Sequence, residues 1–178
     1  PYTKNFVKEI DLAVLTWIFD LYSTYPQVAT GIHYWSMSWI PENQRKIVKS
    51  TDDTSILNRV TNVLFRNIMA VDKDIALLPT LKESFEATIL QLISRQNLTL
   101  ISVWSPTFLI SIVEELHLNH HEYLKKVSSP HLKRILSKWE GQDLSHNLFL
   151  LWPNLKIISC WKTGQSIHFI EKLQSYFK

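Results

Sequence analysis

The chain has 178 residues, and its 46% of hydrophobic residues can form the core of one domain, which excludes a disordered segment. Its 19 Lys and Arg are interspersed with 16 Asp and Glu, so the formal charge of +3 and the pI near 9.0 do not indicate a nucleic-acid binder. No apolar run approaches the roughly 20 residues of a membrane span, and the single cysteine excludes an intrachain disulfide. We therefore expect a cytoplasmic protein without nucleic-acid or membrane partners. Its oligomeric state stays open.

The first third of the chain predicts a helix, a strand and a second helix. Apolar residues recur at helical spacing over residues 3–25, and further apolar residues extend this stripe around most of the helix. We therefore expect a largely buried helix that ends before a proline. The run IHYWSMSWI at 32–40 alternates with period two and predicts a strand with Trp35 and Trp39 on one aromatic face. Residues 41–53 then predict a polar linker, and residues 56–68 a second helix.

The rest of the chain predicts helices that follow buried strands. Thr80 and Glu83 have the spacing of a capping box, which predicts that a third helix starts there. Residues 98–104 and 155–161 are short apolar runs typical of buried strands, and each is followed at once by a predicted helix. Together these elements indicate an α/β fold that is helix-rich with a mostly parallel sheet.

Two Ser-Pro pairs predict helix starts. The first pair, Ser105-Pro106, directly follows the strand at 98–104 and suits an N-cap with proline in the first turn. The second pair, Ser129-Pro130, opens a helix for which Gly141 is expected just past the C-terminus.

In open α/β sheets ligands bind outside the carboxyl ends of the strands, so we expect a ligand near residues 104–107 and 161–165. Trp104 stands at such a strand end, beside a predicted helix N-terminus. The N–H groups of Thr107 and Phe108 could meet a carboxylate there, although a helix cap beside a core tryptophan explains the same residues.

The densest titratable cluster is EELHLNHHE at 114–122. Glu114, His117 and His121 fall close to one helical face, whereas His120 is expected to point elsewhere. A metal could be held by such residues, but no second matching helix is present, so we expect a solvated face and no metal.

Candidate catalytic residues are isolated. Cys160 lies inside a predicted buried strand, where its thiol is expected to be a core group. Asp143, Ser145 and His146 are neighbours without the nucleophile-elbow pattern of a serine hydrolase. No phosphate-binding loop can be built from the three glycines, which are Gly31, Gly141 and Gly164. We therefore expect no catalytic and no nucleotide-binding residue in this chain.

Several segments resemble one enzyme family in the same order and spacing. The block LWPNLK, followed by TG and FIEKL, resembles a segment of the Gretchen Hagen three family, the auxin-responsive, adenylate-forming acyl acid amido synthetases. The opening PYTK resembles the stretch after that family's Ser/Thr-Gly nucleotide loop, and YWSMSWIP resembles its aromatic strand. ISVWSPTFLISIVEEL is similar to a further strand and helix of the family. The resemblance covers essentially the whole chain, and the LWPN block is its most specific part.

Members of that family are ligases that activate a carboxylic acid with ATP and magnesium to an acyl-adenylate, then transfer the acyl group to an amino acid amine. The resemblance implies that residues 1–178 are a single central segment of the N-terminal adenylating domain. The nucleotide loop would precede Pro1 and an acidic nucleotide motif would follow Lys178, so the segment alone is expected to bind neither ATP nor magnesium and to be inactive. The implied partners are a small carboxylic acid and an amino acid.

The resemblance also implies where the acid would bind. Residues 103–109 resemble one wall of the family's acyl acid pocket, and the candidates are Val103, Trp104, Ser105, Thr107 and Phe108. The sequence has Ser-Pro-Thr where small residues including glycine are usual, which leaves the shape of the pocket and the identity of the acid open. The alternative is a non-catalytic small-molecule-binding or protein-interaction module derived from the same fold.

Overall fold

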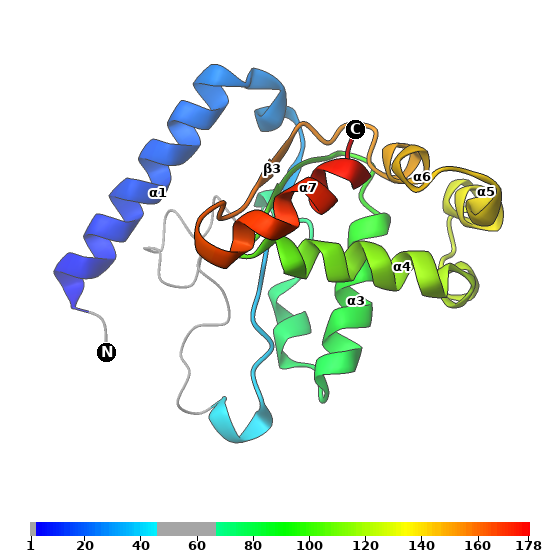
Figure 1. The fold of residues 1–178 in the computed structure, drawn as a ribbon. Helices are drawn as coiled ribbons and strands as arrows, with labels where there is room; N and C mark the ends of the chain where they lie inside the picture. Colours follow the sequence, from blue (N-terminus) through cyan, green and yellow to red (C-terminus); the bar gives the residue numbers. More distant parts are fainter. Residues whose placement is uncertain (1–2, 46–66) are drawn as a thin grey trace.

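Three short parallel strands form the centre of the molecule. In a computed structural model that describes residues 3–45 and 67–178, the strands are β1 (Ile32–Trp35), β2 (Leu98–Ser102) and β3 (Ile157–Ser159), paired side by side in the order β1-β2-β3. Helices lie on both faces of this sheet, with α1 set apart on one side (Figure 1). The prediction of a helix-rich α/β fold with a mostly parallel sheet is confirmed.

The helices begin at the caps that the sequence indicates. The side chains of Thr80, Ser105 and Ser129 accept the first free N–H groups of the helices that follow, and the capping box with Glu83 is complete. Such caps satisfy donors that the helix itself leaves without a partner. The helices are α1 (Lys4–Thr24), α3 (Leu81–Ile93), α4 (Pro106–Lys126), α5 (Pro130–Ser137), α6 (Leu144–Leu151) and α7 (Ile167–Tyr176). Short 3-10 turns are η1 (Pro26–Thr30), η2 (Glu42–Gln44), η4 (Lys73–Leu77), η5 (Trp139–Gly141) and η6 (Gly164–Ser166).

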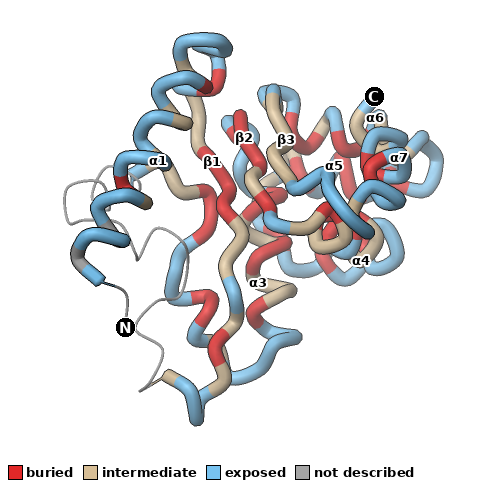
Figure 2. Tube along the Cα trace, turned by 60° about the vertical axis from the view of Figure 1, so that its left-hand side comes forward, coloured by how far each residue is buried: buried red, intermediate tan, exposed pale blue. Residues whose placement is uncertain are grey.

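The strands separate two packing regions because neighbouring side chains alternate between the faces. On one face, the aligned residues Tyr34, Ile101 and Ile158 belong to the main hydrophobic core with α3 to α7. On the other face, Leu100 packs with Leu21 of α1 and Val28 of η1. The strands are therefore mostly buried, whereas α1 is mostly exposed (Figure 2).

The LWPN block fastens β3 to the sheet. Trp152, at the end of α6, is 2% exposed, and its indole N–H donates to the carbonyl oxygen of Leu92 at 2.9 Å. Two residues later, the Asn154 amide donates to the carbonyl oxygen of Gln96 at 2.8 Å. The N–H of Lys156 then reaches the Thr99 carbonyl of β2 at 3.0 Å. The most specific part of the family resemblance thus holds β3 beside β2.

The N-terminal helix and strand differ from expectation. Helix α1 leaves four large apolar side chains exposed, so the prediction of a largely buried helix is wrong. The strand predicted at 32–40 ends at Trp35 because the chain leaves β2 and turns toward η4, where the Ile40 N–H donates to Ala76. Trp39 therefore lies outside the strand and donates its indole N–H to Leu78. The predicted linker at 41–53 and helix at 56–68 lie largely outside the described residues.

Three further differences concern the C-terminal half. The strand predicted at 155–161 is reduced to β3, which is half-buried because only β2 pairs with it. Gly141 does not follow the end of α5, since Lys138 is the C-cap and the chain continues into η5. Helix α6 was not predicted, and Asp143 is its N-cap. Within the described residues, no helix is long and apolar enough to cross a bilayer.

Candidate functional site

A small hollow lies at the carboxyl ends of the three strands, where ligands bind in open α/β sheets. Its volume is about 180 Å³, and every lining residue belongs to the end of a strand or to the one or two residues that follow. The lining residues are Trp35, Ser36, Ser102, Val103, Trp104, Ser159 and Trp161. The position of the hollow makes it the first candidate for the site.

Two tryptophans that follow β2 and β3 stand together at this hollow. The ring centroids of Trp104 and Trp161 are 5.2 Å apart at an angle of 50°, and the Trp161 N–H donates to the Trp104 carbonyl oxygen at 3.2 Å. Their side chains are about half exposed, at 52% and 62%. Aromatic faces held in this way offer a large apolar surface to a flat ligand. The pair can therefore bind the apolar part of a molecule.

The remaining lining is neutral. Backbone hydrogen bonds hold the strand ends together, from Ser36 N–H to Ser102 and from Val103 N–H to Ser159, both at 2.9 Å. The three serines supply hydroxyl groups, and none of the lining residues is ionisable. This wall can contact and orient a ligand, but it offers no group for proton transfer and no charge for a carboxylate.

The five residues predicted for the acid pocket are only partly brought together. Val103 and Trp104 line the hollow, whereas Ser105, Thr107 and Phe108 do not. The hydroxyls of Ser105 and Thr107 are hydrogen-bonded to each other at 2.6 Å, and the Phe108 ring packs edge-on against Phe85 at 6.0 Å.

The helix N-terminus beside Trp104 is already capped. The Thr107 N–H donates to the Ser105 hydroxyl at 3.3 Å, and the Phe108 N–H donates to the Ser105 carbonyl oxygen at 3.2 Å. The expectation that these two N–H groups are free for a carboxylate is therefore wrong. The physical reason is the N-cap serine, which satisfies the same donors.

The sequence missed part of the lining. Trp161 falls in the second predicted ligand segment, 161–165, but it was not named as a site residue, and Ser159 at the end of β3 was not named either. The signal that could have found both is their place at the end of a parallel strand beside Trp104. Gly164 forms the turn that follows, with φ +61° in the left-handed region that favours glycine.

A larger hollow of about 520 Å³ lies between α6, β3 and α7. Phe149, Ile158 and Leu173 are among its apolar lining residues, and Cys160 faces it as well. Burial raises the pKa of the Cys160 thiol, so this group stays protonated and is a poor nucleophile. Cys160 also packs against the main core, as the sequence predicted.

The predicted metal-ligand face is divided among separate contacts. Glu114 pairs with Lys172 of α7 at 2.5 Å and accepts a hydrogen bond from the Tyr176 hydroxyl at 3.1 Å. The hydrogen bond from Lys172 lowers the pKa of the Glu114 carboxyl, which keeps it ionised. His117 accepts the indole N–H of Trp139 at 3.0 Å. Glu114, His117 and His121 therefore do not converge.

The described residues do not fit a nucleoside triphosphate. A Cβ on Gly31 would stand 2.2 Å from the Asn97 carbonyl oxygen and 2.3 Å from Thr99 Cγ2, so this glycine serves close packing of η1 against β2. Gly141 faces open space, and Gly164 lies in a single turn. Among residues 3–45 and 67–178, no glycine belongs to a loop that could wrap a phosphate with its N–H groups. The described residues therefore do not indicate a binding site for the phosphates of ATP or their magnesium ion.

Comparisons with known proteins agree with this geometry. Residues 128–178 match the model of the GH3 family N-terminal domain, where GH3 stands for Gretchen Hagen three. This match includes the LWPN block and helices α5 to α7. No curated protein sequence matches the chain significantly.

Solved structures match nearly the whole chain. The AtGH3.15 acyl acid amido synthetase in complex with 2,4-DB aligns with a TM-score of 0.72 at 14% identity, and it covers 99% of this chain. A second structure, of the GH3.15 acyl acid amido synthetase, aligns with a TM-score of 0.71 at 14% identity and the same coverage. The chain spans 36% of the length of each of these proteins. At this identity the likeness shows the fold.

The sequence match at residues 128–178 and the shared fold are independent of each other. Together they agree with the resemblance that the sequence motifs indicated: residues 128–178 match the GH3 family N-terminal domain, and the chain has the fold of solved acyl acid amido synthetases.

Proposed function

We propose that this chain forms one wall of the acyl acid pocket in a cytoplasmic GH3-type amido synthetase. In that enzyme a carboxylic acid is activated with ATP to an acyl-adenylate, and the acyl group passes to an amino acid amine. The observation that carries the proposal is the hollow at the carboxyl ends of β1, β2 and β3, flanked by Trp104 and Trp161 in a fold shared with acyl acid amido synthetases. The protein seen with 2,4-DB supports a small acid as the ligand class.

The chemistry of the wall defines what it would recognise. Trp104 and Trp161 offer ring faces, and the serines offer neutral hydroxyls, so the wall would hold the apolar body of the acid. The carboxylate would point away from this wall, because the lining has no cation and the helix N–H groups are taken by Ser105. In the proposed enzyme the chain therefore sets acid selectivity by positioning the substrate rather than by reacting with it.

ATP and magnesium belong to the proposed enzyme but do not fit the described residues of this chain. We assign their binding to the family motifs that the resemblance places before Pro1 and after Lys178 in a longer protein. The 178-residue chain alone is accordingly expected to be inactive in adenylation.

The test uses the longer protein and the two exposed tryptophans. In Trp104→Ala and Trp161→Ala, loss of apolar contact should raise the apparent KM for the acid by about tenfold or more, or change the preference among acids. The apparent KM for ATP should change less. Steady-state adenylation with a panel of acids measures this. Phe149→Ala is the matched control, because Phe149 is also an exposed aromatic residue, at 63%, but lines the other hollow.

The control also tests whether the acid binds in the other hollow, which the alternative, a non-catalytic binding module, would use. The 520 Å³ hollow between α6, β3 and α7 favours that function, because it is larger and lies away from the aromatic pair. If Phe149→Ala weakens acid binding and both tryptophan variants keep the parental KM and acid preference, the pocket assignment at β2 and β3 is wrong.

A further inference from the structure

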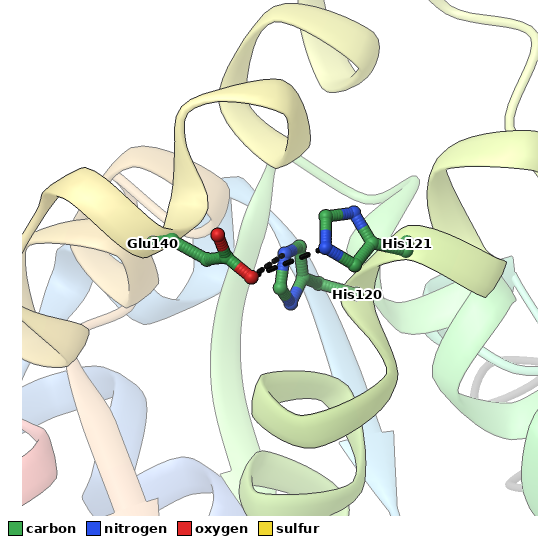
Figure 3. Close-up of side chains that lie close together, drawn as sticks. All are labelled: His120, His121 and Glu140. Carbon is green, nitrogen blue, oxygen red and sulfur yellow. Dashed lines mark hydrogen bonds and ion pairs between the residues drawn. The ribbon is translucent and has the colours of Figure 1, made fainter.

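Helix α4 is interrupted near its C-terminal end, and the interruption places two consecutive histidines toward the same acidic residue. Asn119 has φ −115° and ψ 21°, outside helical values. On a regular helix, consecutive side chains point about 100° apart. Here both His120 and His121 lie beside Glu140 of η5 (Figure 3). The expectation that His120 points away from His121 is therefore wrong, because it assumed an unbroken helix.

The spacing of the three side chains suits a metal ion. Nε2 of His121 lies 3.1 Å from Oε1 of Glu140, and Nε2 of His120 lies 3.7 Å from the same oxygen. One ligand atom from each residue can be chosen so that all three lie within 4.8 Å of one another. Ligands at about 2.0–2.1 Å from a tetrahedral ion stand about 3.3 Å from each other. Both nitrogen–oxygen distances are close to that value, and the exposed side chains of His121 and Glu140 can move to complete the geometry.

The tautomer of His120 is fixed for metal binding. Its Nδ1 lies 3.0 Å from the His117 carbonyl oxygen, and a carbonyl can only accept, so Nδ1 carries the proton. In the neutral ring Nε2 then has a free lone pair, and it faces Glu140. A backbone carbonyl that orients a metal-binding histidine in this way is a common feature of metal sites.

Packing holds the His120 ring in place. Its side chain is 5% exposed, and the ring stacks at 6.2 Å and 18° on Trp139, which is buried. The Trp139 indole N–H in turn donates to His117. One ligand of the cluster is therefore preorganised by its surroundings, which lowers the entropy cost of binding.

The other two groups are open to solvent. The side chains of His121 and Glu140 are 63% and 74% exposed, which leaves room for water as further ligands. In the described part of the chain, these two histidines are the only basic side chains within ion-pair distance of Glu140, so no lysine or arginine competes for its carboxylate. Two imidazoles and one carboxylate with open positions form a ligand set typical of zinc.

We propose that His120, His121 and Glu140 bind one divalent transition-metal ion of the zinc class. The ion would join the last turns of α4 to η5 and so fix the connection between α5 and α6. This site is separate from the proposed acid pocket, and it departs from the expectation of no metal, which considered Glu114 and His117 instead of His120 and Glu140.

The test is a titration of the metal-free 178-residue chain with Zn²⁺, followed by calorimetry and thermal unfolding. We expect saturable binding of one equivalent, and a Tm that rises by about 5–10 °C when free Zn²⁺ is 100-fold above Kd. His121→Ala and Glu140→Gln change exposed side chains, so both variants should fold and should bind Zn²⁺ at least about tenfold more weakly.

The matched control is His168→Ala, which removes an exposed histidine on α7 outside the cluster and should bind as the parent does. Thermal unfolding in a chelator checks that all variants are folded. The proposal is overturned if the parent shows no saturable binding, or if His121→Ala and Glu140→Gln bind Zn²⁺ with the parental affinity. The first result would mean that the cluster is only an ion pair between histidine and glutamate.

Discussion

The two faces of the sheet are packed in different ways. On one face, α3 to α7 share one continuous core with Tyr34, Ile101 and Ile158 of the strands. On the other face, α1 and η1 contact the strands through two small clusters, one centred on Leu100 and one on Trp35. Both α1 and α4 show helical spacing of apolar residues. The difference teaches that this periodicity predicts a helix but does not predict how much of its apolar surface is covered.

Aromatic rings form part of the attachment of helix α1 to the sheet. Trp17 packs edge-on against Trp35, with centroids 5.5 Å apart, and Tyr22 packs edge-on against His33 at 5.7 Å. His33 is fully buried, and its Nε2 lies 3.1 Å from the Val28 carbonyl oxygen. Burial lowers the pKa of His33, so the imidazole stays neutral between α1 and the sheet.

The largest effect is expected in the continuous core, at Trp152. Trp152→Ala removes a buried ring that stacks on Phe177 at 6.3 Å and donates to Leu92, so it should lower the free energy of unfolding by about 3–5 kcal/mol. Urea denaturation of the 178-residue chain measures the loss.

Trp152→Phe is the control for the hydrogen bond. It keeps a ring in the core, and the Arg95 N–H still donates to the Leu92 carbonyl, so the expected loss is only about 1–2 kcal/mol. A loss below about 1 kcal/mol in Trp152→Ala would contradict the role given to the LWPN block.

A smaller effect is expected where η1 meets β2. Gly31→Ala places a Cβ against the backbone carbonyl of Asn97 and the side chain of Thr99, and the backbone carbonyl cannot move without shifting the strand. The φ of Gly31 is −128°, which alanine adopts easily, so the expected loss of about 1–3 kcal/mol is steric. Equilibrium unfolding of the variant checks this value.

Gly141→Ala is the matched control, because an added Cβ there meets nothing within 4 Å. It should change the free energy of unfolding by less than about 0.5 kcal/mol. Equal effects at the two glycines would mean that the close approach of η1 to β2 does not limit packing on the α1 face.

Local signals were the most predictable part of this fold. The caps at Thr80, Ser105 and Ser129 were found because a cap depends on residues within one helical turn. Asp143 offered the same signal for α6, since its carboxylate accepts the N–H groups of Ser145 and His146. That helix was missed because these polar residues were considered as catalytic candidates instead of as a helix start.

Features that depend on distant partners were less predictable. The carboxyl ends of the strands indicated Trp104, but Trp161 joins it through pairing of β3 with β2, which lie far apart in the sequence. The break at Asn119 has no cause in the helical pattern of 106–126, and without it His120 cannot be placed beside Glu140. Tertiary packing therefore determines the positions of both Trp161 and His120.

The smallest effect is expected on the exposed side of α1, and it is the most direct check of the difference between the two faces. Leu12 and Phe19 are 67% and 74% exposed, so they gain little from folding in the 178-residue chain. Glutamine has a good helix propensity, and therefore the double variant Leu12→Gln with Phe19→Gln should keep the free energy of unfolding within about 0.5 kcal/mol of the parent. The same variant should reduce self-association seen by light scattering, because it removes apolar surface from one helix face.

Trp17→Ala on the opposite side is the control and should destabilise the chain, since Trp17 packs against Trp35. A loss above about 1 kcal/mol in the double variant would mean that this face of α1 is covered in solution, and that the two faces of the sheet are more alike than their packing indicates.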